Sequence, residues 1–195
     1  MARKKKMVIG ILIVAVILTI GGIILGFGLL VGESQLKVQR EEEHFPLVTG
    51  NNLDRQEFQF PRDFDGVYNL VIVPFQQRQQ LDVNTWIPAA QELERTFPDL
   101  IYYELPTIYK LPALSRTFIN EGMRAGIPDQ TSRERTITLY LDKDTFKSAL
   151  GITSETEIYL FLVDKSGNIL WKETGTFSEQ KAAGLVEILQ EFEEN

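Results

Sequence analysis

The chain has 195 residues and a mass of 22.3 kDa, enough for one globular domain and one additional segment. Hydrophobic residues make up 44% and charged residues 24% of the sequence, so we expect most of the chain to fold. The net charge of −7 argues against a nucleic-acid-binding protein, and the absence of cysteine excludes disulfides and thiol chemistry.

The N-terminal residues predict a membrane anchor. Residues 7–31 contain no charge, and about 20 apolar residues suffice for a helix to cross a bilayer. Within them Gly22 and Gly26 have the GxxxG spacing that permits close packing against another membrane helix, although lipid-exposed glycines are common too. A cleaved signal peptide is the main alternative, but its apolar region usually has about 7–15 residues and ends at a small-x-small site. A buried core helix is a further alternative.

Charge around this span predicts its orientation. Residues 1–6 carry four cations, so the positive-inside rule makes them a cytoplasmic stub and places the rest of the chain on the extracytoplasmic side. Residues 32–44 are strongly polar and predict a juxtamembrane stalk. Beyond the stub, 16 Lys and Arg stand against 27 Asp and Glu, so this part would repel both nucleic acid and anionic lipid headgroups.

Residues 45–195 predict a single α/β domain. A first hairpin strand is expected at residues 57–60, after a turn at 49–52. Asn84 or Thr85 would begin the first helix, with Pro88 in its first turn, and Ser178 would cap the last helix. The remaining strands are predicted at 70–75, 101–105, 136–141, 157–164 and 169–174, and the helices at 84–97, 112–123, 142–150 and 178–192.

The order of these elements predicts the fold class. Helices between the early strands imply parallel pairing, and a turn at 165–168, with Gly167 and Asn168 at positive φ, makes the last two strands an antiparallel hairpin. The result is a mixed β-sheet flanked by helices, which is the thioredoxin-like arrangement; an unrelated α/β sandwich is the alternative. The hairpin itself, from Val163 to Trp171, is similar to the Leu-Ile-Asp-x-x-Gly-x-Ile motif of thioredoxin-like and peroxiredoxin-related domains.

The corner between the first buried strand and its helix is the first candidate site. Thioredoxin-like redox proteins carry Cys-x-x-Cys there, opposed by a cis-proline. Here the corner holds Gln76, Gln77, Gln79 and Gln80, and Ile158 occupies the proline position. Thiol exchange needs a thiolate, so we expect no redox chemistry. The glutamine amides could pair with an extended peptide, or they could simply form a hydrophilic loop that caps the helix.

Other candidates for chemistry are weak. His44, the only histidine, lies at the stalk boundary and is more typical of a solvated or packing residue than of a catalytic base. Asp63 and Asp65 begin like a calcium loop, but positions 6 and 12 hold Tyr68 and Pro74 in place of Gly and Glu. There is no P-loop or GxGxxG pattern, so we expect no catalytic, metal or cofactor site.

Two further features are candidates for partner binding. Trp86 could anchor a partner, although tryptophans such as Trp86 and Trp171 are more typical of a core or sheet face. Arg124 belongs to a group of arginines that could contact an acidic partner or remain solvated. The other members are Arg116, Arg133 and Arg135.

Residues 45–192 resemble the mitochondrial ATP-synthase assembly factor family, whose members have a thioredoxin-like domain without the redox cysteines. The resemblance lies in residues 103–106, 122–124 with 127–128, 136–141, and 162–171 with Gly175. Where the family usually has arginine before the tryptophan, this chain has Leu170. The resemblance implies a membrane-associated protein that helps to build the proton-translocating sector and catalyses no reaction. Its mitochondrial members work on the matrix side, equivalent to a bacterial cytoplasm, whereas the basic N-terminus here predicts the opposite side.

The sequence therefore predicts a non-catalytic, membrane-anchored protein that binds a membrane protein complex or its subunits and helps to assemble or chaperone it. A permanent accessory subunit of such a complex is the main alternative, and an enzyme of unrecognised chemistry is another. A pocket with two close carboxylates of displaced pKa would favour the enzyme.

Overall fold

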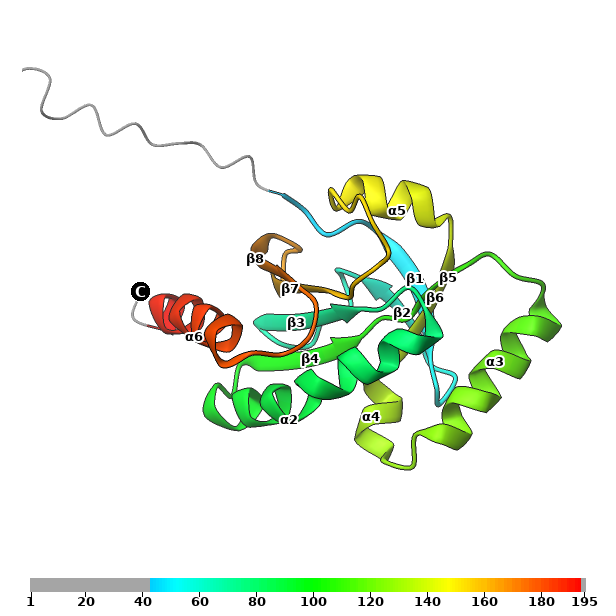
Figure 1. Cartoon of the computed structure of the whole chain (residues 1–195), viewed down its shortest axis with the longest axis horizontal. Coiled ribbons are helices and arrows are strands. Elements are labelled where there is room, and N and C mark those ends of the chain that lie inside the picture. The colour runs from blue at the N-terminus through cyan, green and yellow to red at the C-terminus, as the bar shows by residue number, and fades with distance from the viewer. Residues whose placement is uncertain (1–42, 194–195) are drawn as a thin grey trace, which may run out of the picture. The chain divides into compact units, whose positions relative to one another are not determined.

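A computed structural model describes residues 43–193 (Figure 1). The predicted stub, the anchor with Gly22 and Gly26, and nearly all of the stalk lie outside these residues. Within residues 43–193 no helix is long and apolar enough to cross a bilayer.

The strands described are β1 (Val48–Asn52), β2 (Glu57–Phe60), β3 (Tyr68–Val73), β4 (Leu100–Glu104), β5 (Thr107–Tyr109), β6 (Ile137–Leu141), β7 (Tyr159–Asp164) and β8 (Ile169–Thr174). The helices are the short η1 (Gln77–Gln79), α2 (Gln80–Thr96), α3 (Ala113–Gly126), α4 (Gln130–Arg135), α5 (Lys143–Ala149) and α6 (Glu179–Glu193).

Strand β3 lies inside a mixed sheet with the order β4-β3-β7-β8. It pairs in parallel with β4 and antiparallel with β7, which in turn pairs antiparallel with β8. Leu70 to Val73 are fully buried, because helices α2 and α6 cover one face and an aromatic cluster covers the other (Figure 1). The predicted mixed sheet flanked by helices is therefore confirmed.

The remaining strands form a second sheet. They have the order β2-β1-β6-β5, with β5 parallel to β6. The chain from β4 to β5 joins the two sheets, because Leu105 N donates to Ile72 O (2.8 Å) while Leu139 N donates to Pro106 O (2.9 Å). A parallel bridge between Glu104 and Thr136 lies at the same junction. The carboxyl end of β4 is thus held from both sides.

Strand β1 corrects the prediction of a turn at residues 49–52. Turn-forming residues become a strand here because β1 pairs with both β2 and β6. At Gly50, a Cβ would lie 2.7 Å from Leu139 Cδ2 and from Thr138 O, so only glycine permits this close approach to β6. Strand β5 and helix α4 were not predicted from the sequence.

Helix α2 starts earlier than predicted. It begins at Gln80, and Pro88 lies well inside it. Asn84 and Thr85 do not cap it, since Gln76 and Gln79 form a reciprocal capping box that starts η1 directly before it. Pro88 is tolerated at an exposed position, where water can solvate the carbonyl that loses its N–H partner.

The hairpin β7–β8 closes as predicted, with one difference. Gly167 has a φ of +96°, whereas Asn168 does not adopt positive φ. Asp164 Oδ1 instead accepts hydrogen bonds from the backbone N–H groups of Ser166 and Asn168, both at 2.8 Å. His44 bridges to Asn168, so the described chain joins the sheet one residue before the expected domain start. Ser178 caps α6 as predicted, accepting from Lys181 N at 3.3 Å.

Candidate functional site

The glutamine corner is held together by its own side chains. Gln79 is 1% exposed, and its Oε1 accepts from Phe75 N (2.7 Å) and Gln76 N (3.2 Å). The side-chain amides of Gln76 and Gln79 both donate to the backbone carbonyl of Glu155, each at 2.9 Å. Glu155 belongs to the segment before β7, opposite the corner. The two glutamines therefore tie the corner to the opposing segment and have structural roles.

An ion-pair cluster lies beside these amides, and sequence reasoning did not find it. Lys143 is 4% exposed and its Nζ donates to Glu155 Oε2 (2.6 Å) and Phe75 O (3.3 Å). Lys147 Nζ lies 2.9 Å from Glu155 Oε1. Although desolvation acts to raise the pKa of Glu155, the hydrogen bonds from Lys143 and Lys147 leave that pKa lowered. Where a redox protein would present cysteines, this domain has a closed polar network.

Ile158 and Trp86 are core residues. Both side chains are fully buried. Ile158 O accepts from Gly175 N at 2.9 Å, and Trp86 Nε1 donates to Gly175 O at 3.0 Å. Neither side chain presents surface to a partner in this structure. Of the predicted glutamines, Gln77 is exposed, and Gln80 is half-buried and donates to Asn84 Oδ1 at 3.1 Å.

Three of the four predicted arginines form ion pairs within the described part of the domain, and Arg116 does not. Arg124 pairs with Asp54 (3.1 Å) and lies 3.9 Å from Glu121. The same Asp54 lies 3.5 Å from Arg133 Nε. Arg135 pairs with Glu94, and the guanidinium of Arg116 lies 5.8 Å from the ring of Tyr140. Arg124 and Arg133 thus attach α3 and α4 to Asp54 in the β1–β2 turn, and Arg135 attaches α4 to α2. The charges of these three arginines are paired within the domain.

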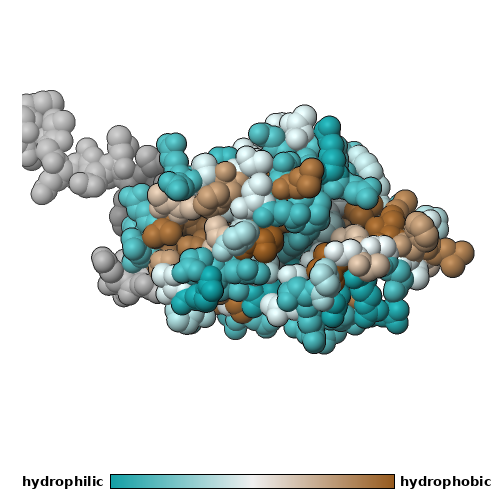
Figure 2. All heavy atoms as spheres, turned by 60° about the horizontal axis from the view of Figure 1, so that its bottom comes forward, coloured by the Kyte–Doolittle hydropathy of each residue, from teal (hydrophilic) through white to brown (hydrophobic). Residues whose placement is uncertain are grey.

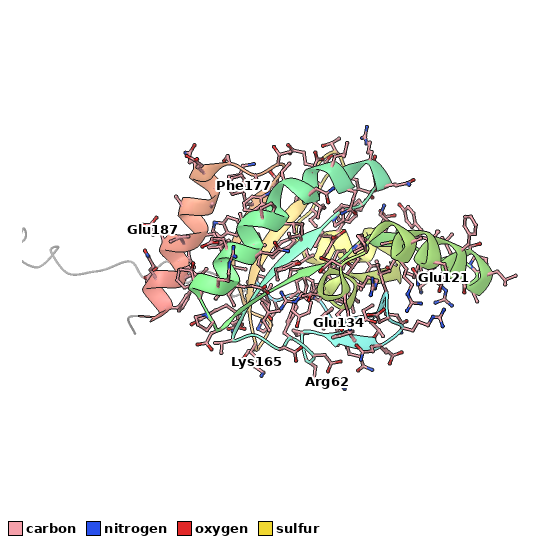
Figure 3. The ribbon with its side chains drawn as sticks, turned by 90° about the horizontal axis from the view of Figure 1, so that it is seen from below. Arg62, Glu121, Glu134, Lys165, Phe177 and Glu187 are labelled. Carbon is pink, nitrogen blue, oxygen red and sulfur yellow. The ribbon has the colours of Figure 1, made fainter. Side chains whose placement is uncertain are left out.

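A pocket of about 260 Å³ lies between α2, the carboxyl end of β4 and the α3–α4 segment. In Figure 3, Glu121 marks α3 and Glu134 marks α4. Glu104 lines the pocket and is only 4% exposed, and its Oε1 has no hydrogen-bond partner. Burial raises the pKa of Glu104 to about 7, while a hydrogen bond from Gln80 acts in the opposite direction. The other lining residues are Asn84, Ile87, Pro88, Tyr102, Ile127, Ser132 and Thr136.

The pocket has few groups of the kinds that acid–base or metal chemistry uses. Glu104 is the only carboxyl group among its lining residues, so a pair of carboxylates is not formed there. The hydroxyl of Ser132 donates to Asp129 at 2.8 Å in the cap of α4. Among residues 43–193 no group of three or more His, Asp or Glu could hold a metal ion. The feature of the sequence that could have indicated this pocket was a single acidic residue, Glu104, inside the apolar strand predicted at residues 101–105.

Comparison with known proteins agrees with this fold. The "putative electron transfer protein" of Aquifex aeolicus VF5 superposes with a TM-score of 0.54; it is 12% identical, and the match covers 76% of this chain and 96% of that chain. The thioredoxin domain of a thiol-disulfide oxidoreductase from Bacteroides vulgatus is 20% identical over 74% of this chain and 93% of that chain, with a TM-score of 0.47. No protein-family model and no curated protein matches the sequence.

At such low identity, likeness establishes the fold alone. The described residues form a mixed α/β domain of the thioredoxin-like class, with sheets flanked by helices. The sequence contains no cysteine, so the corner that carries the redox pair in thioredoxin-like oxidoreductases has no thiol in this chain.

Proposed function

We propose that the chain is a membrane-anchored, non-catalytic thioredoxin-like protein that binds a partner polypeptide and helps to assemble or chaperone a membrane protein complex. The observation that carries this proposal is helix α3. None of its 14 residues is buried, and Leu114 and Phe118 are 87% and 82% exposed. These two side chains are four residues apart and so lie on the same side of the helix. Large apolar side chains exposed together are typical of an interaction surface.

The opposite side of α3 is the one attached to the domain. The hydroxyl of Tyr140 donates to Asn120 Oδ1 at 2.8 Å, and Ile119 and Met123 are half-buried. Figure 1 shows α3 beyond β5 and β6, and Figure 2 shows apolar side chains gathered at the end of the domain that carries it. Leu114 and Phe118 therefore point away from the domain's own core and are available to a partner.

The partner that fits this surface is a membrane-protein subunit with an apolar groove. An amphipathic helix that presents apolar side chains at i and i+4 suits recognition in a hydrophobic groove. A bilayer surface suits it less, because acidic residues outnumber basic ones beyond the stub and Glu121 lies beside the apolar side of α3. An anchor at residues 7–31 would keep the domain concentrated next to membrane proteins.

Two further observations support a role without catalysis in complex assembly. The corner that would carry redox chemistry is closed by Gln76, Gln79 and the Lys143–Glu155 pair. The sequence resemblance over residues 45–192 favours ATP synthase as the complex. Mitochondrial members of that family work on the matrix side, whereas the basic N-terminus of this chain predicts the opposite side of the membrane. The side that the domain occupies must therefore be measured as well.

The proposal is tested by site-specific crosslinking. A photoreactive benzoyl-phenylalanine replaces Phe118 in the full-length protein, and adducts formed in native membranes are separated on native gels and identified by mass spectrometry. The matched control carries the same group at Gln91, an exposed polar position of α2. We expect an adduct from position 118 and none from position 91. The adduct should contain one membrane-complex subunit and should occur in incomplete, substoichiometric complexes. Changing Leu114 to Ser should abolish it.

Other adducts would overturn the proposal. Lipid adducts alone would make α3 a bilayer contact, and adducts to a second copy of the chain would make it a dimer interface. A fixed-ratio adduct in the mature complex would identify a permanent accessory subunit in place of an assembly factor. Equal labelling from Phe118 and Gln91 would show that α3 has no specific partner.

A further inference from the structure

Two buried polar atoms in the pocket have no partner within the domain. Glu104 is 4% exposed and Tyr102 is 2% exposed, yet neither Glu104 Oε1 nor the Tyr102 hydroxyl makes a hydrogen bond among residues 43–193. Buried polar groups are nearly always paired, so each such exception needs an explanation. Both residues line the same pocket, so these two unpaired atoms belong to side chains that border one cavity.

The strand that carries these atoms is fixed. Tyr102 and Glu104 are two residues apart on β4, which puts their side chains on the same face of the sheet. Their backbone pairs in register with β3 on one side, and Glu104 bridges to Thr136 on the other. Tyr102 N also donates to Glu94 Oε1 at 2.9 Å. The backbone therefore has no freedom to bring the two unpaired atoms to partners inside the domain.

The surroundings of Glu104 favour a positive ligand. The other polar side chains lining the pocket are neutral, namely Gln80, Asn84, Ser132 and Thr136 besides Tyr102. The guanidinium of Arg135 lies 4.9 Å from the Tyr102 ring, but it is paired with Glu94. No cationic side chain in the described lining neutralises the Glu104 carboxylate, so burial has the largest effect on its pKa. A cation entering the pocket would stabilise the ionised form.

We propose that this pocket binds a monovalent organic cation, an alkylammonium or guanidinium group that donates hydrogen bonds to Glu104 and Tyr102. A volume of about 260 Å³ suits a group the size of one amino-acid side chain. Ile87, Pro88 and Ile127 supply apolar surface for its aliphatic stem. A divalent metal ion would need several more oxygen ligands than one carboxylate supplies. The inference stands independently of the partner role of α3.

The cation has two possible sources, a free amine or a lysine or arginine side chain of a polypeptide. Isothermal titration calorimetry on the full-length protein in neutral detergent distinguishes them. The probes are butylammonium and N-acetyl-lysine methylamide, which share one charged stem, with butanol as the neutral control. Tighter binding of the blocked lysine identifies a polypeptide source, because only that probe carries peptide groups. Equal or weaker binding of the blocked lysine identifies a free amine.

Variants test whether Glu104 makes the contact. We expect Glu104→Gln to weaken binding of either cation at least tenfold, and Tyr102→Phe to weaken it severalfold. The matched control, Glu92→Gln, makes the same change at an exposed position of α2 and leaves binding unchanged. Lowering the pH from about 8 to about 5.5 protonates Glu104 and weakens binding more than tenfold in the wild type, but not in Glu104→Gln.

Three results would overturn the inference. Cation binding that persists unchanged in Glu104→Gln would place the ligand elsewhere. Butanol binding as tightly as butylammonium would show an apolar cavity without charge selection. Absence of binding by either cation at millimolar concentration, with the fold of the protein verified by circular dichroism, would show that the unpaired atoms serve no ligand.

Discussion

Two polar sites meet at the start of α2, and they differ in how well their buried groups are paired. Gln79 faces the corner, where its amide makes three hydrogen bonds and the Lys143–Glu155 pair completes the network. Gln80, the next residue, faces the pocket, where Glu104 Oε1 and the Tyr102 hydroxyl are unpaired. A fully paired network stabilises a fold, whereas unpaired buried groups reduce stability unless a ligand completes them. The difference indicates structure at the corner and binding at the pocket.

The largest effect is expected from breaking the corner. Gln79→Ala removes the acceptor for Phe75 N and Gln76 N and one of the two donors to Glu155 O, leaving the buried N–H of Phe75 unpaired. We expect a loss of about 4 kcal/mol in the free energy of unfolding, since a buried unpaired group costs about 1–3 kcal/mol and each of the two other lost hydrogen bonds about 1 kcal/mol. Urea denaturation followed by circular dichroism measures it. Gln77→Ala, at an exposed position, is the control and should change stability by less than about 0.5 kcal/mol. A loss below about 1 kcal/mol in Gln79→Ala would contradict a structural role.

The next effect concerns the pH dependence that Glu104 produces. In the unfolded chain its carboxyl titrates near 4.5, and in the folded domain its pKa is about 7. Between pH 4.5 and 7 the folded domain keeps a proton on Glu104 that the unfolded chain has released. Protonated Glu104 therefore stabilises the fold fully below pH 4.5, and this stabilisation is lost as the pH rises through 7. At about 1.36 kcal/mol per pKa unit, the loss is roughly 3 kcal/mol.

Glu104→Gln should remove this contribution. We expect the variant to be more stable than the wild type at about pH 8, and the difference between the two proteins to shrink as the pH approaches about 5. Denaturation curves of both proteins across this range, without ligand, give the difference directly and cancel the titration of all other groups. A difference that does not vary with pH would mean that Glu104 titrates normally.

A smaller effect separates two neighbouring tyrosines. Tyr102→Phe removes a buried hydroxyl without a partner, so we expect stability to be unchanged or to increase by about 1 kcal/mol. Tyr103→Phe removes a hydroxyl that accepts from Asp65 N at 3.2 Å and lies 3.4 Å from Asp65 Oδ2, so we expect a loss of about 1 kcal/mol. Thermal denaturation of the two variants compares them. Equal losses would show that the Tyr102 hydroxyl is paired in solution.

The smallest effect on stability is expected at α3. Leu114→Ser and Phe118→Ser change side chains that are almost fully exposed, so each should alter the free energy of unfolding by less than about 0.5 kcal/mol. Leu114→Ser should nevertheless lower the crosslinking yield from benzoyl-phenylalanine at position 118 severalfold. Urea denaturation measures the free energy of unfolding, and the crosslinking assay measures the adduct yield. A destabilisation above about 1 kcal/mol would show that α3 packs against the domain through these residues.

Sequence patterns predicted most of the elements because those elements are stabilised locally. The apolar run at residues 70–75 becomes β3, and Ser178 starts α6, because an apolar run and a helix cap can be recognised within a few consecutive residues. Strand β1 and the start of α2 were missed for the opposite reason. Gly50 fits because of Leu139, and Gln79 is fixed by Glu155, and each partner is more than 70 residues away in sequence.

The sequence by itself determined the absence of thiol chemistry and the presence of an apolar segment at residues 7–31, since composition carries this information, and the order of its elements predicted the thioredoxin-like arrangement. Only the tertiary structure decided which polar groups are paired. It turned the glutamine corner into a structural network, placed Trp86 and Ile158 in the core, and left Glu104 Oε1 without a hydrogen-bond partner in a pocket. The physical reason is that burial and hydrogen bonding depend on residues brought together from distant parts of the chain.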